Sequence, residues 1–286
     1  ALEGEALPNT ELRLVVNGNL GSSESAKPTV HTDERGHWRA DVDVGHLLDP
    51  QATYQVVVWN ESSGASSKPL RFKVDPQWAP LVTVDDEVGD DRGPSGQYRY
   101  PREANWQQLR PADIQRVQVE ESSGALRVVL TMNDISTQWN PPNGFDHVAF
   151  TLFFELRGVE GGSQVMPQQQ AMLPQGMRWH RRLRAGGWSL ALFSHDGADE
   201  QNEGRSISAG ARVDADKAKR TISFTLPKSA LGTADQLRGA RLYISTWDYD
   251  SRFRALTPGG GDFVFGGGQS AEPLIMDDTA VIVLPR

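Results

Sequence analysis

The apolar residues of this chain occur in short stretches that alternate with polar residues, and this pattern constrains its fold most strongly. A period of two places every second side chain on one face of a β-strand, whereas an amphipathic helix needs a period near 3.6. Residues 54–60 and 240–249 show the alternation clearly. Only residues 228–232 and 233–239 have the composition for a turn or two of helix. The pattern predicts an all-β protein.

The strand pattern divides into two parts around the segment DPQWAP, residues 75–80. Pro76 and Pro80 stiffen the backbone and stop either neighbouring strand from continuing, as in a short linker. About five short strands before this segment predict a small immunoglobulin-like β-sandwich over residues 1–77, without the Cys–Trp–Cys signature of antibody domains. Residues 78–286 predict a larger antiparallel β-sandwich. In that part, residues 148–155 are largely apolar on both faces, as expected between two packed layers.

Composition excludes several classes of function. The net charge of −8 argues against binding to nucleic acid or to anionic lipid, because both need a basic protein face. The absence of cysteine excludes disulfides, thiolate metal sites and a cysteine nucleophile. No apolar run approaches the roughly 20 residues that span a bilayer, so no transmembrane segment is expected. The first residues lack the pattern of a signal peptide, and we interpret them as an internal cut of a longer polypeptide or a processed mature end.

Five carboxylates are crowded into residues 85–91, and the chain then turns through Gly93, Pro94 and Gly96. Close carboxylates repel one another unless a cation or an arginine compensates their charge. Calcium prefers several oxygen ligands in a flexible geometry, which a glycine-containing acidic turn supplies. The alternative is a solvated surface turn, since the spacing of an EF-hand loop is absent. The candidate metal ligands are Asp85, Asp86, Glu87, Asp90 and Asp91.

Exposed aromatic rings bind sugars because the apolar face of a pyranose stacks on a ring while nearby polar groups bind its hydroxyls. Trp139 and Trp179 lie in polar, loop-like contexts, where function is usually found. Trp247 ends a strand, and Tyr249, two residues later, points to the same side. These four residues are the candidate carbohydrate-binding residues, with packing in the core as the alternative for each. Three other tryptophans lie in alternating patterns and are expected in the core, namely Trp38, Trp59 and Trp188.

No motif in the chain points to catalysis. The histidines lack a metal-type spacing such as H-x-x-x-H, and neither a G-x-S-x-G turn nor a phosphate-binding loop is present. A carboxylate pair for glycoside hydrolysis needs only spatial proximity, but nothing in the sequence singles one out. We therefore expect that this chain is not an enzyme. The basic run at residues 178–184 is expected to pair with carboxylates of the chain itself.

Three motifs in the second part resemble the C-terminal module of glucodextranase. DDEVGDDRGPSGQYRYP resembles that family's opening D-P-x-G-D-D-x-G-P-G-x-Y-x-Y-P, and WNPPNGFDH resembles its W-x-S-P-N-G-F-S segment. FVFGGG, followed by IMDDTA and a final VIVLP, resembles its closing strands. The first part resembles the small β-domain that precedes this module. The matching positions are Asp86, Gly89, Asp90, Asp91, Gly93, Pro94, Gly96, Tyr98, Tyr100 and Pro101 in the first motif, and Trp139, Pro142, Asn143, Gly144 and Phe145 in the second.

The resemblance implies a β-sandwich similar to family 9 carbohydrate-binding modules and DOMON domains, in which calcium commonly holds loops in place. The acidic turn is accordingly predicted to hold a structural calcium ion at the start of the module. The sequence departs from the family pattern at three positions. Glu87 stands in place of a proline, Ser95 is an added residue, and Asp146 replaces a small or neutral residue.

The resemblance also implies a function: a non-catalytic C-terminal region of a larger, exported α-glucan hydrolase. Residues 1–77 would be a spacer, and the module would bind α-glucan or a cell-surface polysaccharide and keep the parent's catalytic domain close to it. The alternative is a purely structural module that stabilises its parent enzyme without binding sugar. Because some related sandwiches bind haem, a haem site is a minor alternative, for which Met132, Met166, Met172, Met177 and Met276 are available.

Overall fold

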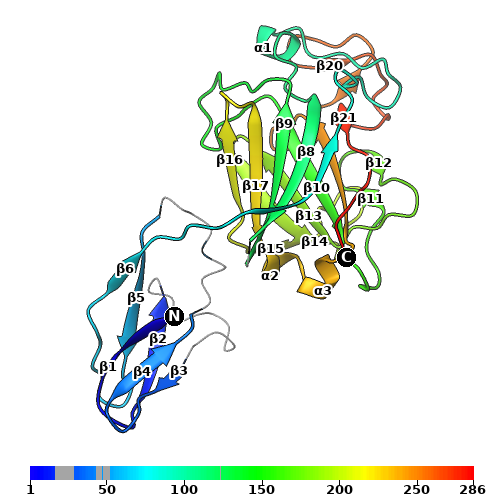
Figure 1. Cartoon of the computed structure of the whole chain (residues 1–286). Coiled ribbons are helices and arrows are strands. Elements are labelled where there is room, and N and C mark those ends of the chain that lie inside the picture. Colours follow the sequence, from blue (N-terminus) through cyan, green and yellow to red (C-terminus); the bar gives the residue numbers. More distant parts are fainter. Residues whose placement is uncertain (17–28, 43–46, 48–51, 123) are drawn as a thin grey trace. The chain divides into compact units, whose positions relative to one another are not determined.

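The computed structural model describes the chain except for residues 17–28, 43–46, 48–51 and 123 (Figure 1). Its contacts divide the chain into two compact units, Ala1–Gln77 and Trp78–Arg286, and the division falls inside the segment with two prolines. Strands dominate both units, so the predicted all-β fold is confirmed. The helices in the described ranges have four residues each, and none of them has the length and apolar character to cross a membrane.

The first unit contains a four-stranded sheet in the order β3–β2–β5–β6 and a two-stranded sheet of β1 and β4. Leu12 and Leu14 of β2 are buried at alternate positions, as the sequence pattern requires. A turn at residues 34–36 separates β3 from β4, and the two strands join different sheets. The strands are β1 (Leu2–Glu5), β2 (Glu11–Val16), β3 (Thr29–His31), β4 (His37–Ala40), β5 (Tyr54–Trp59) and β6 (Leu70–Phe72).

The second unit contains two large antiparallel sheets that face each other (Figure 1). The first has five strands in the order β16–β17–β9–β8–β7: β7 (Ala79–Asp85), β8 (Ile114–Glu121), β9 (Ala125–Met132), β16 (Arg212–Asp216) and β17 (Thr221–Pro227). The second has seven strands, in which β21 and β22 both pair with β18: β10 (Ala149–Glu155), β13 (Arg181–Gly186), β14 (Ser189–Ser194), β15 (Arg205–Ile207), β18 (Arg241–Trp247), β21 (Asp277–Asp278) and β22 (Ile282–Val283).

Short elements complete the second unit. The strands β11 (Val165–Met166) and β12 (Ala171–Met172) form one small ladder, and β19 (Leu256–Thr257) and β20 (Phe265–Gly266) form another. The helices are α1 (Ala104–Gln107), α2 (Lys228–Leu231) and α3 (Ala234–Leu237). The two helical turns expected from the sequence are thus α2 and α3. Thr233 caps α3 with its hydroxyl, and Gln236 returns the bond in a capping box.

The strand β10 is covered on both faces, as its sequence predicts. Phe150, Leu152 and Phe154 point into the main core between the two sheets. Phe153 points the other way, into a second cluster with Trp179 and residues from the connection between β10 and β13. Each fully buried side chain of this size contributes roughly 1.5–3 kcal/mol by leaving water. The seven-stranded sheet therefore carries an apolar layer on each side.

The basic run at residues 178–184 largely forms β13, and two of its arginines, Arg182 and Arg184, pair with a carboxylate of the chain, as expected. Arg182 is fully buried, and its Nη2 lies 3.0 Å from Glu203 Oε1. Arg184 donates from Nε and Nη2 to the two oxygens of the same carboxylate, at 2.7 and 3.1 Å. The guanidinium of Arg184 also covers the ring of Tyr249 at 3.8 Å. This cluster therefore stabilises the sheet and does not present a free basic surface.

Candidate functional site

The WNPPNGF segment, residues 139–145, lies in the connection from β9 to β10 and is anchored in the core by Phe145. The Phe145 ring is fully buried and packs edge-on against Phe150 at a centroid distance of 5.5 Å. Gly144 adopts a φ of 79°, a conformation that glycine reaches without strain. Its amide donates to Pro141 O at 3.0 Å, which closes the turn. The motif therefore fixes a surface loop through a buried aromatic anchor.

Asn143 joins this loop to the turn between β13 and β14. Its backbone amide donates to Gly187 O at 3.1 Å, and its side-chain Nδ2 donates to Gly186 O at 2.6 Å. A Cβ added at Gly187 would lie 2.4 Å from Phe145 O, so only glycine permits this approach of the two backbones. The two turns are thus held side by side, and Trp188 is brought close to Trp139.

Trp139 and Trp188 form an exposed aromatic pair, which we call the tryptophan platform. The two side chains are 44% and 59% exposed. Their ring centroids lie 6.3 Å apart, with the planes tilted by 36°. A pyranose held between two rings would need roughly 7–8 Å, because each carbon contact takes about 3.5–4.0 Å. The rings therefore form neighbouring parts of one apolar surface and not the opposite walls of a slot.

His147 supports the platform from below. Its ring stacks on Trp139 at 4.0 Å with a tilt of 15°, and the edge-on ring of Trp106 lies 5.0 Å away. Asp146 accepts the backbone N–H of Trp139 through Oδ2 at 2.7 Å, while its Oδ1 lies 2.5 Å from His147 Nδ1. Asp146, which departs from the family pattern, therefore orients both rings. Glu103 Oε2 lies 3.3 Å from His147 Nε2, on the other side of the imidazole.

Ser136, His147 and Asp146 do not form a catalytic triad. Ser136 Oγ and Asp146 Oδ1 both approach the same ring nitrogen, Nδ1, at 3.2 and 2.5 Å. A triad needs the nucleophile on one nitrogen and the carboxylate on the other, so that the imidazole can accept the hydroxyl proton. Ser136 is also buried. This arrangement holds a loop in place and gives no support to nucleophilic catalysis.

The structure corrects the predicted carbohydrate-binding residues. Trp179 and Trp247 are both fully buried, so neither offers a ring face to a sugar and the prediction is wrong for them. Tyr249 is partly buried and has Arg184 over its ring. Trp188, expected in the core, is exposed because β14 begins only at Ser189 and leaves the tryptophan in the preceding turn. Of the predicted set, Trp139 alone is exposed, and His147 covers one face of its ring.

The five methionines considered for a haem site lie in separate apolar clusters or at the surface. Met132 and Met276 lie in the main core, while Met166 and Met177 lie in the second apolar cluster. Met172 is 57% exposed. These positions match side chains that fill a core or cover a surface. They give no support to an axial ligand pair.

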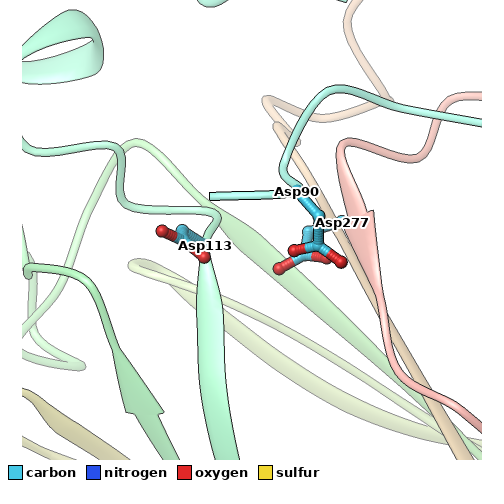
Figure 2. Close-up of side chains that lie close together, drawn as sticks. All are labelled: Asp90, Asp113 and Asp277. Atoms are coloured by element: carbon cyan, nitrogen blue, oxygen red, sulfur yellow. The ribbon is translucent and has the colours of Figure 1, made fainter. Parts of the chain in front are cut away.

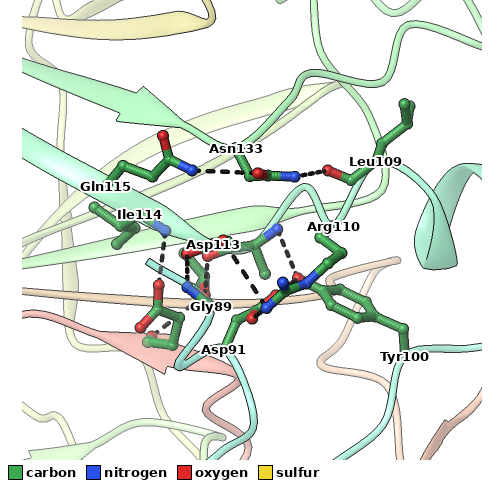
Figure 3. Close-up of polar contacts among 12 residues, drawn as sticks. Gly89, Asp91, Tyr100, Leu109, Arg110, Asp113, Ile114, Gln115 and Asn133 are labelled. Atoms are coloured by element: carbon green, nitrogen blue, oxygen red, sulfur yellow. Dashed lines mark hydrogen bonds and ion pairs between the residues drawn. The ribbon is translucent and has the colours of Figure 1, made fainter. Parts of the chain in front are cut away.

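The carboxylates of the acidic turn do not converge on one point but have different surroundings. Asp85 is exposed and pairs with Arg116, with Nε 2.6 Å from Oδ1. Asp91 is buried, forms an ion pair with Arg110 and accepts the hydroxyl of Tyr100 at 2.5 Å (Figure 3). Glu87 is exposed at the surface. Asp85 and Asp91 are thus compensated by arginines, so the structure does not support them as metal ligands.

Asp90 instead meets two carboxylates from distant parts of the chain, Asp113 and Asp277 (Figure 2). One oxygen of each residue lies within 4.8 Å of one oxygen of each of the others. Asp113 directly precedes β8 and Asp277 begins β21, and both are buried. Asp277 Oδ2 accepts the backbone N–H of Ile114 at 2.7 Å. We call these three residues the carboxylate cluster.

Burial and mutual repulsion raise the pKa values in this region. Burial raises the pKa of Asp277 to about 9, and the charges of Asp90, Asp86 and Asp113 add to the effect. Burial, followed by the charge of Asp90, raises the pKa of Asp86 to about 6. The pKa of Asp90 and that of Asp113 are raised chiefly by burial as well. The ionised forms are therefore disfavoured when only protein groups surround them.

No signal in the sequence assigns Asp113 to this cluster, since it stands alone in the segment PADIQ. Asp277 lies in IMDDTA, one of the closing motifs, but nothing in the motif linked it to the acidic turn. The proximity arises because β21 pairs with the end of β18 while β8 begins nearby. Only the packing of the two sheets brings these carboxylates together.

A two-sheet sandwich with an exposed aromatic pair on its loops has the features of a binding module. A family described as the C-terminal, SLH-like binding module of glucodextranase matches residues 81–282. The chain belongs to this family, and the resemblance seen in its motifs is confirmed. A search of curated proteins found no match.

Proposed function

We propose that this chain is a carbohydrate-binding accessory region of an α-glucan hydrolase and that the tryptophan platform binds the sugar. One observation carries the proposal: Trp139 and Trp188 are both exposed and lie side by side, although they come from different turns. Monomeric proteins rarely leave large adjacent aromatic rings in water without a binding role. Membership in a family of glucodextranase binding modules supports glucan as the ligand class.

The platform has the chemistry that a pyranose requires. The two rings offer apolar area to the C–H face of the sugar, and the exposed amide side chain of Asn140, next to Trp139, can bind its hydroxyls. His147 and Asn143 fix the positions of the rings before the ligand arrives, which lowers the entropy lost on binding. Because the rings form one surface and not a slot, the expected ligand is an extended or insoluble glucan that lies across them.

The proposed role is to raise the local concentration of substrate around a catalytic domain. Tethering an enzyme to glucan converts repeated encounters into intramolecular ones and needs no new contact in its active site. The partners are therefore an α-glucan or cell-surface polysaccharide and the catalytic domain of a parent hydrolase. An extracellular or cell-surface location follows from such a substrate.

Substitution of the platform residues tests the proposal directly. We expect Trp139→Ala and Trp188→Ala each to weaken binding to isomalto- or malto-oligosaccharides by about 10-fold or more, as for truncation of a central aromatic anchor. Isothermal titration measures soluble ligands, and co-sedimentation measures insoluble glucan. Trp78→Ala is the matched control, because Trp78 precedes β7 at the opposite end of the five-stranded sheet and is covered by Arg127 at 4.2 Å.

The outcome separates this proposal from a purely structural role. If the wild-type chain binds glucan and both platform variants bind it equally well, the platform is not the site. If the wild-type chain binds no glucan at all, the exposed rings are better explained as a docking surface for a neighbouring domain. In that case, the platform substitutions should lower the melting temperature of the parent's catalytic domain and leave its retention on glucan unchanged.

A further inference from the structure

The carboxylate cluster contains more negative charge than the surrounding protein groups neutralise. Asp90, Asp113 and Asp277 come from three separate segments and converge within 4.8 Å. The cationic group that approaches the cluster is the guanidinium of Arg110, whose Nη2 lies 3.9 Å from Asp113 Oδ2. The same guanidinium is already bound to Asp91, to which its Nε donates at 3.1 Å. Arg110 is therefore shared, and the cluster lacks a dedicated counter-charge among the described residues.

Two buried oxygens near the turn lack hydrogen-bond donors. Asp113 is fully buried, and its Oδ1 accepts the N–H of Gly89 at 3.2 Å (Figure 3). Its Oδ2 is buried and accepts no hydrogen bond within the described part of the chain, and the same holds for Asp86 Oδ2. A buried carboxylate oxygen without a donor costs free energy, because burial removes its hydrogen bonds to water and no protein group replaces them. A bound cation would satisfy these oxygens.

We infer that Asp90, Asp113 and Asp277 form a binding site for one divalent cation of the calcium class. All three ligands are hard carboxylate oxygens, and no histidine or cysteine belongs to the group, which disfavours zinc. Calcium accepts an irregular set of oxygens, whereas magnesium demands near-ideal octahedral geometry. The unpaired oxygen of Asp86 lies in the same turn and is available as a further ligand.

The position of the site gives the cation a structural role. Asp113 leads into β8 of the five-stranded sheet, whereas Asp277 begins β21 of the seven-stranded sheet. Asp90 lies in the turn that follows β7. A cation bound by all three would therefore connect the two sheets at one end of the sandwich and fix the turn between them. The bond from Ile114 N–H to Asp277 Oδ2 already joins the sheets at this point, so the cation reinforces an existing contact.

The test titrates Ca²⁺, and Mg²⁺ in parallel, into the chelator-treated full chain by calorimetry and follows its melting temperature. We expect saturable Ca²⁺ binding with a stoichiometry near one and weaker Mg²⁺ binding. The transition of the second unit should rise by roughly 5–10 °C at a hundredfold excess over the dissociation constant. Asp113→Asn and Asp277→Asn should each lose at least about 10-fold in Ca²⁺ affinity.

Two further variants keep the test decisive. Asp85→Asn is the matched control, since Asp85 lies in the same acidic turn but is exposed and paired with Arg116; it should bind Ca²⁺ like the wild type. Asp90→Asn changes the exposed member of the cluster, so it should fold and yet lose Ca²⁺ affinity. In chelator, Asp277→Asn should be at least as stable as the wild type, because it removes the cost of burying an uncompensated carboxyl group, and Ca²⁺ should reverse that order.

Three results would overturn the inference. The first is the absence, at neutral pH, of both saturable Ca²⁺ binding and a shift in melting temperature in the wild-type chain, which would mean that protonation alone relieves the repulsion. The second is Ca²⁺ binding by the cluster variants as tight as that of the wild type, which would place the cation elsewhere. The third is a loss of affinity in Asp85→Asn as large as that in Asp113→Asn, which would indicate a diffuse attraction of cations to the acidic turn.

Discussion

Replacement of Trp247 by alanine is expected to lower the free energy of unfolding of the second unit by about 3–5 kcal/mol. The indole is fully buried, stacks on Phe265 at 4.2 Å and donates from Nε1 to Arg254 O at 2.9 Å. The substitution therefore creates a cavity and also leaves the carbonyl of Arg254 without its donor. Chemical denaturation followed by far-ultraviolet circular dichroism measures the change.

Trp188→Ala is the matched control for this prediction. The same side chain is removed, but from a turn in which it is 59% exposed, so stability should change by no more than about 0.5 kcal/mol. Comparison of the two variants distinguishes a role in packing from a role in binding. The Trp247→Ala substitution should lower stability, and the Trp188→Ala substitution should lower affinity for glucan. Equal losses of stability in the two variants would contradict the burial described for Trp247.

Glu203→Gln is expected to destabilise the second unit by about 3–5 kcal/mol, because it leaves a buried arginine without its counter-charge. Arg182 is fully buried, and both Arg182 and Arg184 depend on this one carboxylate. Glu200→Gln removes an exposed carboxylate from the same connection between β14 and β15 and should change stability by no more than about 0.5 kcal/mol. Denaturant unfolding of the two variants at neutral pH gives the comparison.

The effect of Glu203→Gln should also depend on pH. Burial by itself would raise the pKa of Glu203, but the hydrogen bond from Arg184 and the charges of Arg182 and Arg184 outweigh it and hold the pKa below its ordinary value of 4.5. A carboxyl group with a lowered folded-state pKa adds stability above its unfolded pKa and loses that contribution as the pH falls through the folded-state value. The difference between wild type and variant should therefore shrink below pH 4.5. A difference that is constant across this range would show that the charge of Glu203 is not what stabilises the unit.

The arrangement of strands along the chain was predictable because side-chain alternation is a local property. The pattern at residues 148–155 correctly indicated a strand buried on both faces. The expected helical turns at α2 and α3 are also present. In each case, the information lies within a few residues of the position concerned.

The exposure of a candidate site residue was predictable only where the neighbouring residues in the sequence determine it. Trp139 lies in a polar, proline-rich loop, and the structure leaves it exposed. Trp247 ends a strand whose local pattern allowed exposure, but Tyr98 and Phe265, both distant in sequence, cover it. Trp188 was expected in the core because it stands beside an apolar strand, yet it falls in the turn. One residue of shift at a strand end is enough to reverse such a prediction.

The sequence by itself determined the all-β class, the order of most strands and the family, since these depend on local periodicity and on contiguous motifs. Tertiary structure alone decided which tryptophans face water and which carboxylates meet. The platform requires Asn143 to join two turns more than 40 residues apart. The carboxylate cluster requires β8 and β21, which lie in different sheets, to begin at the same place. Exposure and the convergence of charges are properties of packing, and no short stretch of sequence encodes them.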